Sequence, residues 1–134
     1  MEDLKITDSL KISVVMISYN QEDLIKRAID SIMIQEDYLH ELIISDDCSQ
    51  DDTWKVIEYY QQKYPMKIRG FRHDKNLGIT GNYFSTKDLP TGDIVYVVPG
   101  DDEMGRGLLK LTGQILGKVN IDYQKEYYCV LTDY

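Results

Sequence analysis

The fold class is decided by one stretch of the sequence, Ile12-Ser13-Val14-Val15-Met16-Ile17-Ser18-Tyr19-Asn20. Its first six residues form a short, mostly apolar and β-branched run, which is typical of a strand buried on both faces. Beyond the polar turn, Asn20 with Asp23 three positions later resembles an N-terminal helix cap. Apolar residues then recur at helical spacing, at Leu24, Ile25, Ala28, Ile29, Ile32 and Met33. The stretch therefore predicts a buried strand that leads into an amphipathic helix.

The same alternation continues along the chain. We expect further strands over residues 42–45, near 66–71, over 93–98 and over 127–132, and helices over 53–64, around 79–87 and over 108–116. Strands that alternate with helices imply right-handed crossovers. The predicted fold class is therefore α/β, a mostly parallel sheet with helices on both faces.

Length and composition indicate one domain over residues 1–134. The chain has 15 basic and 23 acidic residues, a net charge of −8, and 43% hydrophobic residues. The acidic balance argues against nucleic acid and anionic membranes as partners. The start lacks a secretion signal, no apolar run approaches the ~20 residues that span a bilayer, and Cys48 and Cys129 suggest neither a disulfide framework nor a zinc site. We therefore expect a cytoplasmic protein without a membrane span.

Acidic residues follow two of the predicted strands. Ligands of open α/β sheets bind beyond the carboxyl ends of the strands, where residues 18–20, 46–49, 74–76 and 100–102 are expected to converge. If the ligand is a nucleotide diphosphate, Asp101 and Asp102 repel it, so a Mg²⁺ or Mn²⁺ ion must intervene. A carboxylate of Asp46 or Asp47 is suited to accept the N–H of a pyrimidine, and Tyr19 offers a face for stacking.

Taken in order, these motifs resemble those of the inverting nucleotide-sugar glycosyltransferases of family 2, which have the GT-A fold. The resemblance runs from Ile12 to about Met104. It is carried by residues 18–20, residues 41–53, Asn76-Leu77-Gly78 with Asn82, Gly92-Asp93, and Gly100-Asp101-Asp102. It implies a nucleotide-binding set in which Tyr19 and Asp47 contact the base and Asp46 supports the same loop. It also implies that Asp101 and Asp102 occupy the metal and diphosphate site.

The sequence departs from the family pattern in two places. Pro99 stands where the family usually has a carboxylate, so either Asp101 or Asp102 binds the metal while the other orders water or sugar. The general base is expected beyond Tyr134, so we expect a donor-binding half truncated at its C-terminus that transfers sugar slowly or not at all.

The resemblance implies a UDP- or dTDP-sugar as donor and a glycan or lipid-linked acceptor in polysaccharide biosynthesis. The full-length protein would then be cytoplasmic or lie at the inner face of the membrane.

Other interpretations stay open. The chain could be a non-catalytic nucleotide- or metal-binding regulatory module, whereas a phospho-accepting receiver domain would need an acidic pair where residues 18–20 stand. Several candidates also have an ordinary structural interpretation: Asp46 and Asp47 as turn carboxylates, Tyr19 as packing, residues 101–103 as a solvated loop, Ser49 with Asp52 as a capping box, and His73 as a surface or loop residue.

Overall fold

The apolar runs of the sequence form strands, and the segments with helical spacing form helices. The computed structural model describes residues 10–117, so the strand predicted over residues 127–132 lies outside them. The elements are β1 (Ile12–Ser18), α1 (Ile25–Met33), the short 3-10 helix η1 (Glu36–Tyr38), β2 (Glu41–Asp46), α2 (Thr53–Lys63), β3 (Ile68–Arg72), α3 (Gly78–Ser85), β4 (Ile94–Pro99) and α4 (Leu108–Gly117). The predicted alternation is confirmed, with boundaries shifted by one or two residues at most ends.

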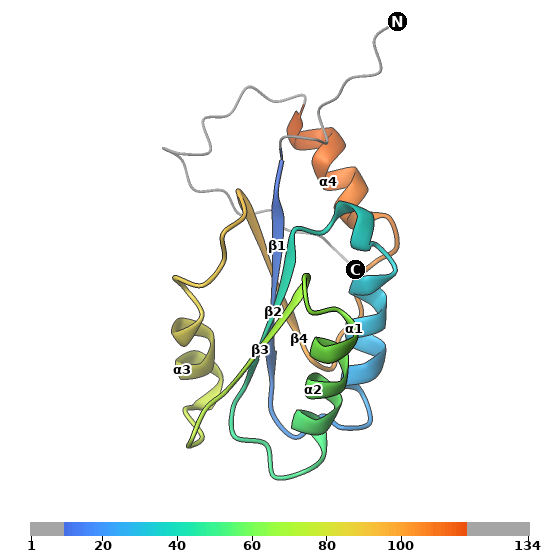
Figure 1. The fold of residues 1–134 in the computed structure, drawn as a ribbon. Coiled ribbons are helices and arrows are strands. Elements are labelled where there is room, and N and C mark those ends of the chain that lie inside the picture. The colour runs from blue at the N-terminus through green and yellow to red at the C-terminus, as the bar shows by residue number, and fades with distance from the viewer. Residues whose placement is uncertain (1–9, 118–134) are drawn as a thin grey trace, which may run out of the picture.

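The four strands form one sheet in the order β3-β2-β1-β4, and every neighbouring pair is parallel. Each helical crossover returns the chain to the amino end of the sheet, so all four strands run in the same direction. Their carboxyl ends therefore meet at one edge, which is the lower end in Figure 1. The central strand is β1, in which Ser18 pairs with Asp46 of β2 and Ile17 pairs with Pro99 of β4. The residues that follow β2 and β4 therefore flank the end of β1.

Helices cover both faces of the sheet, as predicted, with α1, α2 and α4 on one face and α3 on the other (Figure 1). The apolar core lies beneath α1 and α2. There α1 buries five side chains at helical spacing, Ile25, Ala28, Ile29, Ile32 and Met33, against strand residues such as Val14 and Leu42. No helix within residues 10–117 is long and apolar enough to cross a membrane.

The opposite face is held to α3 by polar side chains. Asn82 of α3 is 2% exposed; its Nδ2 donates to the Ser45 carbonyl oxygen at 3.0 Å, and its Oδ1 accepts from Ser45 Oγ at 2.6 Å. His73 joins this cluster, because its Nε2 lies 3.1 Å from Ser45 Oγ and 3.0 Å from Ser85 Oγ. His73 lies in the loop after β3, as expected, but it is half-buried, and its partners come from β2 and α3, which are remote in the sequence.

Candidate functional site

Backbone hydrogen bonds bring the strand exits together. The N–H of Asp47 donates to the Ser18 carbonyl oxygen and that of Gly100 donates to the Ile17 carbonyl oxygen, both at 2.9 Å. The exit of β3 is tied in as well, by the N–H of His73 to the Asp46 carbonyl oxygen at 2.9 Å. The structure therefore places the predicted site residues Tyr19, Asp46, Asp47, Asp101 and Asp102 at one edge of the sheet.

Asp46 is the buried anchor of this edge. Its side chain is 0% exposed and accepts hydrogen bonds from Ser18 Oγ at 3.0 Å, Ser49 N at 2.9 Å and Ser49 Oγ at 2.5 Å. Arg72 Nε of β3 lies 3.7 Å from the same carboxylate and supplies a positive charge. Through these contacts the Asp46 carboxylate links the end of β2 to the ends of β1 and β3.

Ser49 is a residue whose role the sequence did not predict correctly. The capping box of Ser49 and Asp52 is absent, because Asp52 makes no capping hydrogen bond and Ser49 Oγ donates to Asp46 instead. The start of α2 is fastened by Asp51, whose Oδ1 accepts from Thr53 N at 3.0 Å. The local pattern of a cap was present in the sequence, but α2 begins at Thr53 with Asp52 at its N-cap, so Ser49 lies too early to cap the helix, and its hydroxyl accepts instead from Asn20 N at 2.9 Å.

Asp47 faces the beginning of α3. It is 2% exposed, and its two carboxylate oxygens accept from Leu77 N at 2.7 Å and from Gly78 N at 2.9 Å. The α3 helix has no cap of its own, since Leu77 stands at its N-cap position. Asp47 therefore supplies from β2 the negative charge that a helix N-terminus favours.

Residues 19 and 20 form the exit of β1. Tyr19 is 42% exposed, so its ring is accessible at the edge. Asn20 adopts a left-handed φ of 50° and its Oδ1 accepts from Gln50 N at 2.8 Å. The prediction that Asn20 caps the first helix is therefore wrong: α1 begins later, with Leu24 at its N-cap, and Asn20 serves a turn that asparagine tolerates better than most residues.

Asp101 and Asp102 are both exposed and follow β4 in a tight turn closed by Asp102 N and the Pro99 carbonyl oxygen at 3.1 Å. The next acid, Glu103, pairs instead with Arg27 of α1 at 2.9 Å. Within residues 10–117 no three His, Cys, Asp or Glu side chains are grouped as a metal site. Two adjacent exposed carboxylates nevertheless fit Mg²⁺ or Mn²⁺, which take one or two carboxylates and complete their shell with phosphate oxygens and water.

Gln21 also lies at this edge, although the sequence analysis did not single it out. A Cβ atom on Gly100 would lie only 2.3 Å from Gln21 Oε1, so the Gln21 side chain packs directly against the backbone of Gly100. Gln21 is held by its own backbone, which donates from N to Thr53 Oγ1 at 2.8 Å. No local pattern marks such a contact, because Gly100 comes from a strand remote in the sequence.

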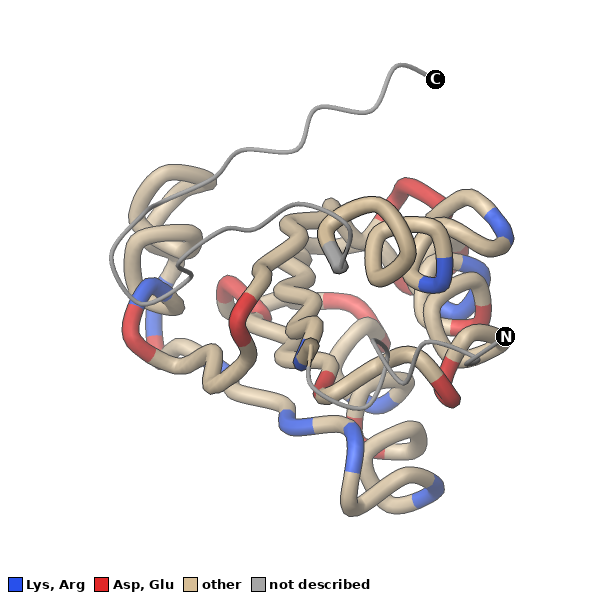
Figure 2. The backbone as a smooth tube through the Cα atoms, turned by 90° about the horizontal axis from the view of Figure 1, so that it is seen from above, with Lys and Arg blue, Asp and Glu red and all other residues tan. Residues whose placement is uncertain are grey.

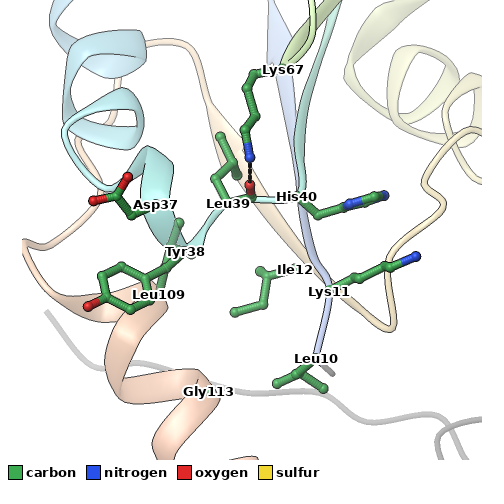
Figure 3. A pocket seen from close by; sticks show the side chains of 10 residues that line it. All are labelled: Leu10, Lys11, Ile12, Asp37, Tyr38, Leu39, His40, Lys67, Leu109 and Gly113. Carbon is green, nitrogen blue, oxygen red and sulfur yellow. Dashed lines mark hydrogen bonds between the residues drawn. The ribbon is translucent and has the colours of Figure 1, made fainter. Parts of the chain in front are cut away.

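The distribution of charge and the pocket at the amino edge of the sheet do not mark a competing site. Acidic and basic residues are interspersed along the described backbone (Figure 2), so the acids at the carboxyl edge are distinguished by their position. A pocket of about 260 Å³ lies at the opposite, amino edge of the sheet, where Figure 3 shows Ile12 and Lys11 beside His40, and Lys67 donating to the Leu39 carbonyl oxygen. It shares no residue with the carboxyl edge.

Comparison with known proteins gives a consistent result. The family model described as Glycosyl transferase family 2 matches residues 13–115. An uncharacterised protein of Mycobacterium bovis is 35% identical over 91 residues, which are 67% of this chain and 26% of that protein. The GalNAc(5)-diNAcBac-PP-undecaprenol beta-1,3-glucosyltransferase of Campylobacter jejuni is 33% identical over 114 residues, 84% of this chain and 36% of that protein.

Among solved structures, residues 1–349 of TarS from S. aureus in complex with UDP-GlcNAc align with a TM-score of 0.69 and 26% identity, covering 80% of this chain and 31% of that chain. The chain spans well under half the length of each of these three proteins.

Proposed function

The chain belongs to glycosyl transferase family 2 and has the GT-A fold, and on this premise we propose that its carboxyl edge holds a nucleotide-diphosphate sugar for inverting transfer to an acceptor hydroxyl. One observation carries the proposal. The exits of β2 and β4 are bonded to adjacent residues of β1, so a base-binding side and an acidic side adjoin each other. A nucleotide diphosphate has the same two ends, a base and a phosphate chain.

The base side is formed by Tyr19 and Asp47. The exposed ring of Tyr19 offers a stacking face, and such stacking is worth about 1–3 kcal/mol per base in single-strand binders. Both oxygens of Asp47 already accept N–H groups, so the N–H of a pyrimidine would use a second lone pair of one of them. A uridine or thymidine nucleotide provides that N–H, and the similarity to TarS, which was solved with UDP-GlcNAc, favours uridine.

Asp46 takes no direct part in this contact. It holds Ser18 and Ser49 in place, and through them the segments that carry Tyr19 and Asp47. We assign it a supporting role.

The acidic side is formed by Asp101 and Asp102. Like charges ~4 Å apart repel by about 4 kcal/mol at an effective dielectric of 20, so a diphosphate cannot approach the pair without a cation. The two aspartates would hold Mg²⁺ or Mn²⁺, which neutralises the departing diphosphate when bound. We assign no general base within residues 10–117.

The relatives support a proposal for the acceptor and the cellular setting. The Campylobacter protein is named for transfer to a saccharide linked to undecaprenol through a diphosphate, so a glycan or lipid-linked acceptor and a place in polysaccharide biosynthesis suit this family. Such an acceptor would bring the full-length protein to the inner face of the membrane from the cytoplasm.

The test is calorimetric titration of the 134-residue chain with UDP, dTDP and GDP, in Mn²⁺ and then in EDTA. We expect UDP to bind in Mn²⁺, and metal removal to weaken binding at least tenfold, because the repulsion from Asp101 and Asp102 returns. Asp101→Asn and Asp102→Asn should each reduce the metal dependence. Glu103→Gln is the matched control, because Glu103 is occupied by Arg27. UDP binding that ignores both metal and the two aspartate variants would contradict the proposal and favour a different binding module.

A further inference from the structure

Gln21 occupies the boundary between the two sides of the proposed site. Its side-chain carbonyl oxygen lies against Gly100, where a Cβ would come within 2.3 Å, and Cβ of Ser18 is 3.2 Å from the same point. Ser18 ends β1, and Gly100 directly precedes the acidic pair. The Gln21 side chain therefore reaches from the exit of β1, which carries Tyr19, to the turn that carries Asp101.

The Gln21 oxygen has no hydrogen bond. Among residues 10–117, Gln21 Oε1 is the only buried side-chain nitrogen or oxygen atom without a partner. Two other glutamines are satisfied: Gln61 Oε1 accepts from Gly70 N at 2.9 Å, and Gln35 Oε1 accepts from Leu109 N at 3.0 Å. Native proteins leave few such atoms, because a buried acceptor without a donor is destabilising.

The comparison with Gln61 is close. Each glutamine packs over a glycine, and a Cβ on Gly70 would lie 2.8 Å from Gln61 Oε1. Both side chains are half-buried. The difference is that Gln61 takes a hydrogen bond from its glycine, whereas the N–H of Gly100 is already given to Ile17. Gln61 has a structural partner, and Gln21 lacks one at the proposed site.

The chemistry of a nucleotide-diphosphate sugar decides which group supplies the missing donor. Diphosphate oxygens only accept, and the base N–H belongs with Asp47 in the proposed site. The remaining donors close to the nucleotide are the ribose hydroxyls, and the ribose lies between base and diphosphate, as Gln21 lies between Tyr19 and Asp101. We propose that Gln21 is a substrate-positioning residue whose side-chain carbonyl accepts a hydrogen bond from a ribose hydroxyl; this inference rests on the proposed function.

The free protein is prepared for this contact. The terminal amide torsion of glutamine has a broad energy profile, so the amide turns toward a ligand at little cost. Because Oε1 has no partner among the described residues, turning it breaks no hydrogen bond there. The ligand contact therefore satisfies an acceptor that is unsatisfied in the free protein.

The test combines one substitution with one change in the ligand. Gln21→Met keeps the length of the side chain and removes its polar atoms. In Mn²⁺, we expect wild type to bind UDP about 3- to 10-fold more tightly than 2′,3′-dideoxy-UDP, the range of one neutral hydrogen bond. Gln21→Met should bind both ligands equally, near the wild-type affinity for the dideoxy compound. It should also keep or raise the melting temperature of the free chain, because an unsatisfied buried acceptor is removed.

Gln61→Met is the matched control. It leaves Gly70 N without its acceptor, so the melting temperature should fall while the preference for UDP is kept. A preference for UDP that persists in Gln21→Met, or no preference in wild type, overturns the inference and leaves the proposed function standing. The wild-type comparison needs no variant, so it decides the matter even if Gln21→Met does not fold. Failure of wild type to bind UDP at all overturns the proposed function and this inference with it.

Discussion

Asp46 shows how one carboxylate determines the geometry of the residues around it. It is fully buried and accepts three hydrogen bonds, one from Ser18 and two from Ser49. Asp46→Ala leaves these donors, and the nearby charge of Arg72, without their acceptor. We expect the free energy of unfolding to fall by about 2–4 kcal/mol, as measured by urea titration at pH 7. Asp88→Ala, at an exposed position, should stay within about 0.5 kcal/mol of wild type, and a similarly small effect of Asp46→Ala would contradict this account.

At the residue scale the sequence predicted positions better than contacts. The apolar runs locate the strand ends, and the sheet topology then places Asp46, Asp47, Asp101 and Asp102 at one edge. The partners of these side chains come from remote segments, which local patterns do not reveal. Ser49 and Asn20 illustrate this, since both carry the local pattern of a helix cap, whereas Ser49 Oγ accepts from Asn20 N and Asn20 Oδ1 accepts from Gln50 N, between the exits of β1 and β2.

At the scale of elements, α3 depends on β2 for its first turn. Asp47, directly after β2, accepts from Leu77 N, and it shares the N–H of Gly78 with Asn76 Oδ1, so it satisfies N–H groups that a helix start leaves without an intrahelical acceptor. We expect Asp47→Ala to make the amides of residues 77–82 exchange with solvent about 5- to 30-fold faster, corresponding to the loss of 1–2 kcal/mol that a missing cap causes. Hydrogen exchange followed by NMR measures this directly. Asp74→Ala, at an exposed position in the same loop, is the control, and unchanged exchange in α3 of Asp47→Ala would show that the cap is dispensable.

The order and type of the described elements could be predicted because each apolar run or helical stripe reports on one element. The boundaries of α3 were predicted to within two residues, as 79–87 against the observed Gly78–Ser85, but its attachment to the sheet was not predicted. The attachment of α3 to the sheet depends on the hydrogen bonds between Asn82 and Ser45. A contact of this kind leaves no periodic pattern in the sequence. Such polar contacts become visible only once the sheet is assembled.

At the scale of the whole molecule, Glu41 links stability to pH. Burial alone raises the pKa of Glu41, but hydrogen bonds from the backbone and hydroxyl of Thr91, from Ser13 and from Arg69 outweigh burial and lower the pKa from 4.5 to about 2. Because the folded-state pKa lies below the unfolded one, Glu41 contributes stability above pH 4.5, and this contribution is lost as the pH falls from 4.5 toward 2.

Glu41→Gln tests this dependence. We expect the variant to be about 1–3 kcal/mol less stable than wild type at pH 7, and the difference to close as the pH approaches 2. Urea unfolding at pH 7, 4.5 and 3 measures it, with Glu36→Gln at an exposed position as control. A difference that is the same at all three pH values would mean that the charge of Glu41 plays no part.

The whole-molecule arrangement could be predicted only in outline. The alternation of elements predicted a mostly parallel sheet with helices on both faces, and both features are confirmed. The position of β1 between β2 and β4 could not be read from the sequence, because strands buried on both faces are alike in composition. The proposed site depends on this order, which sets the exits of β2 and β4 on either side of β1.

The pairing of β1 with β4 has a consequence for how the chain folds. Ile12 pairs in register with Ile94, so this half of the sheet forms only after the polypeptide has closed a loop of about 80 residues. Pairings between remote segments slow folding, whereas β1, α1 and β2 are close in sequence and can assemble early. As the nascent chain leaves the ribosome, the exits of β1 and β2 would therefore form before Asp101 and Asp102 join them. The proposed ability to bind a diphosphate would form last.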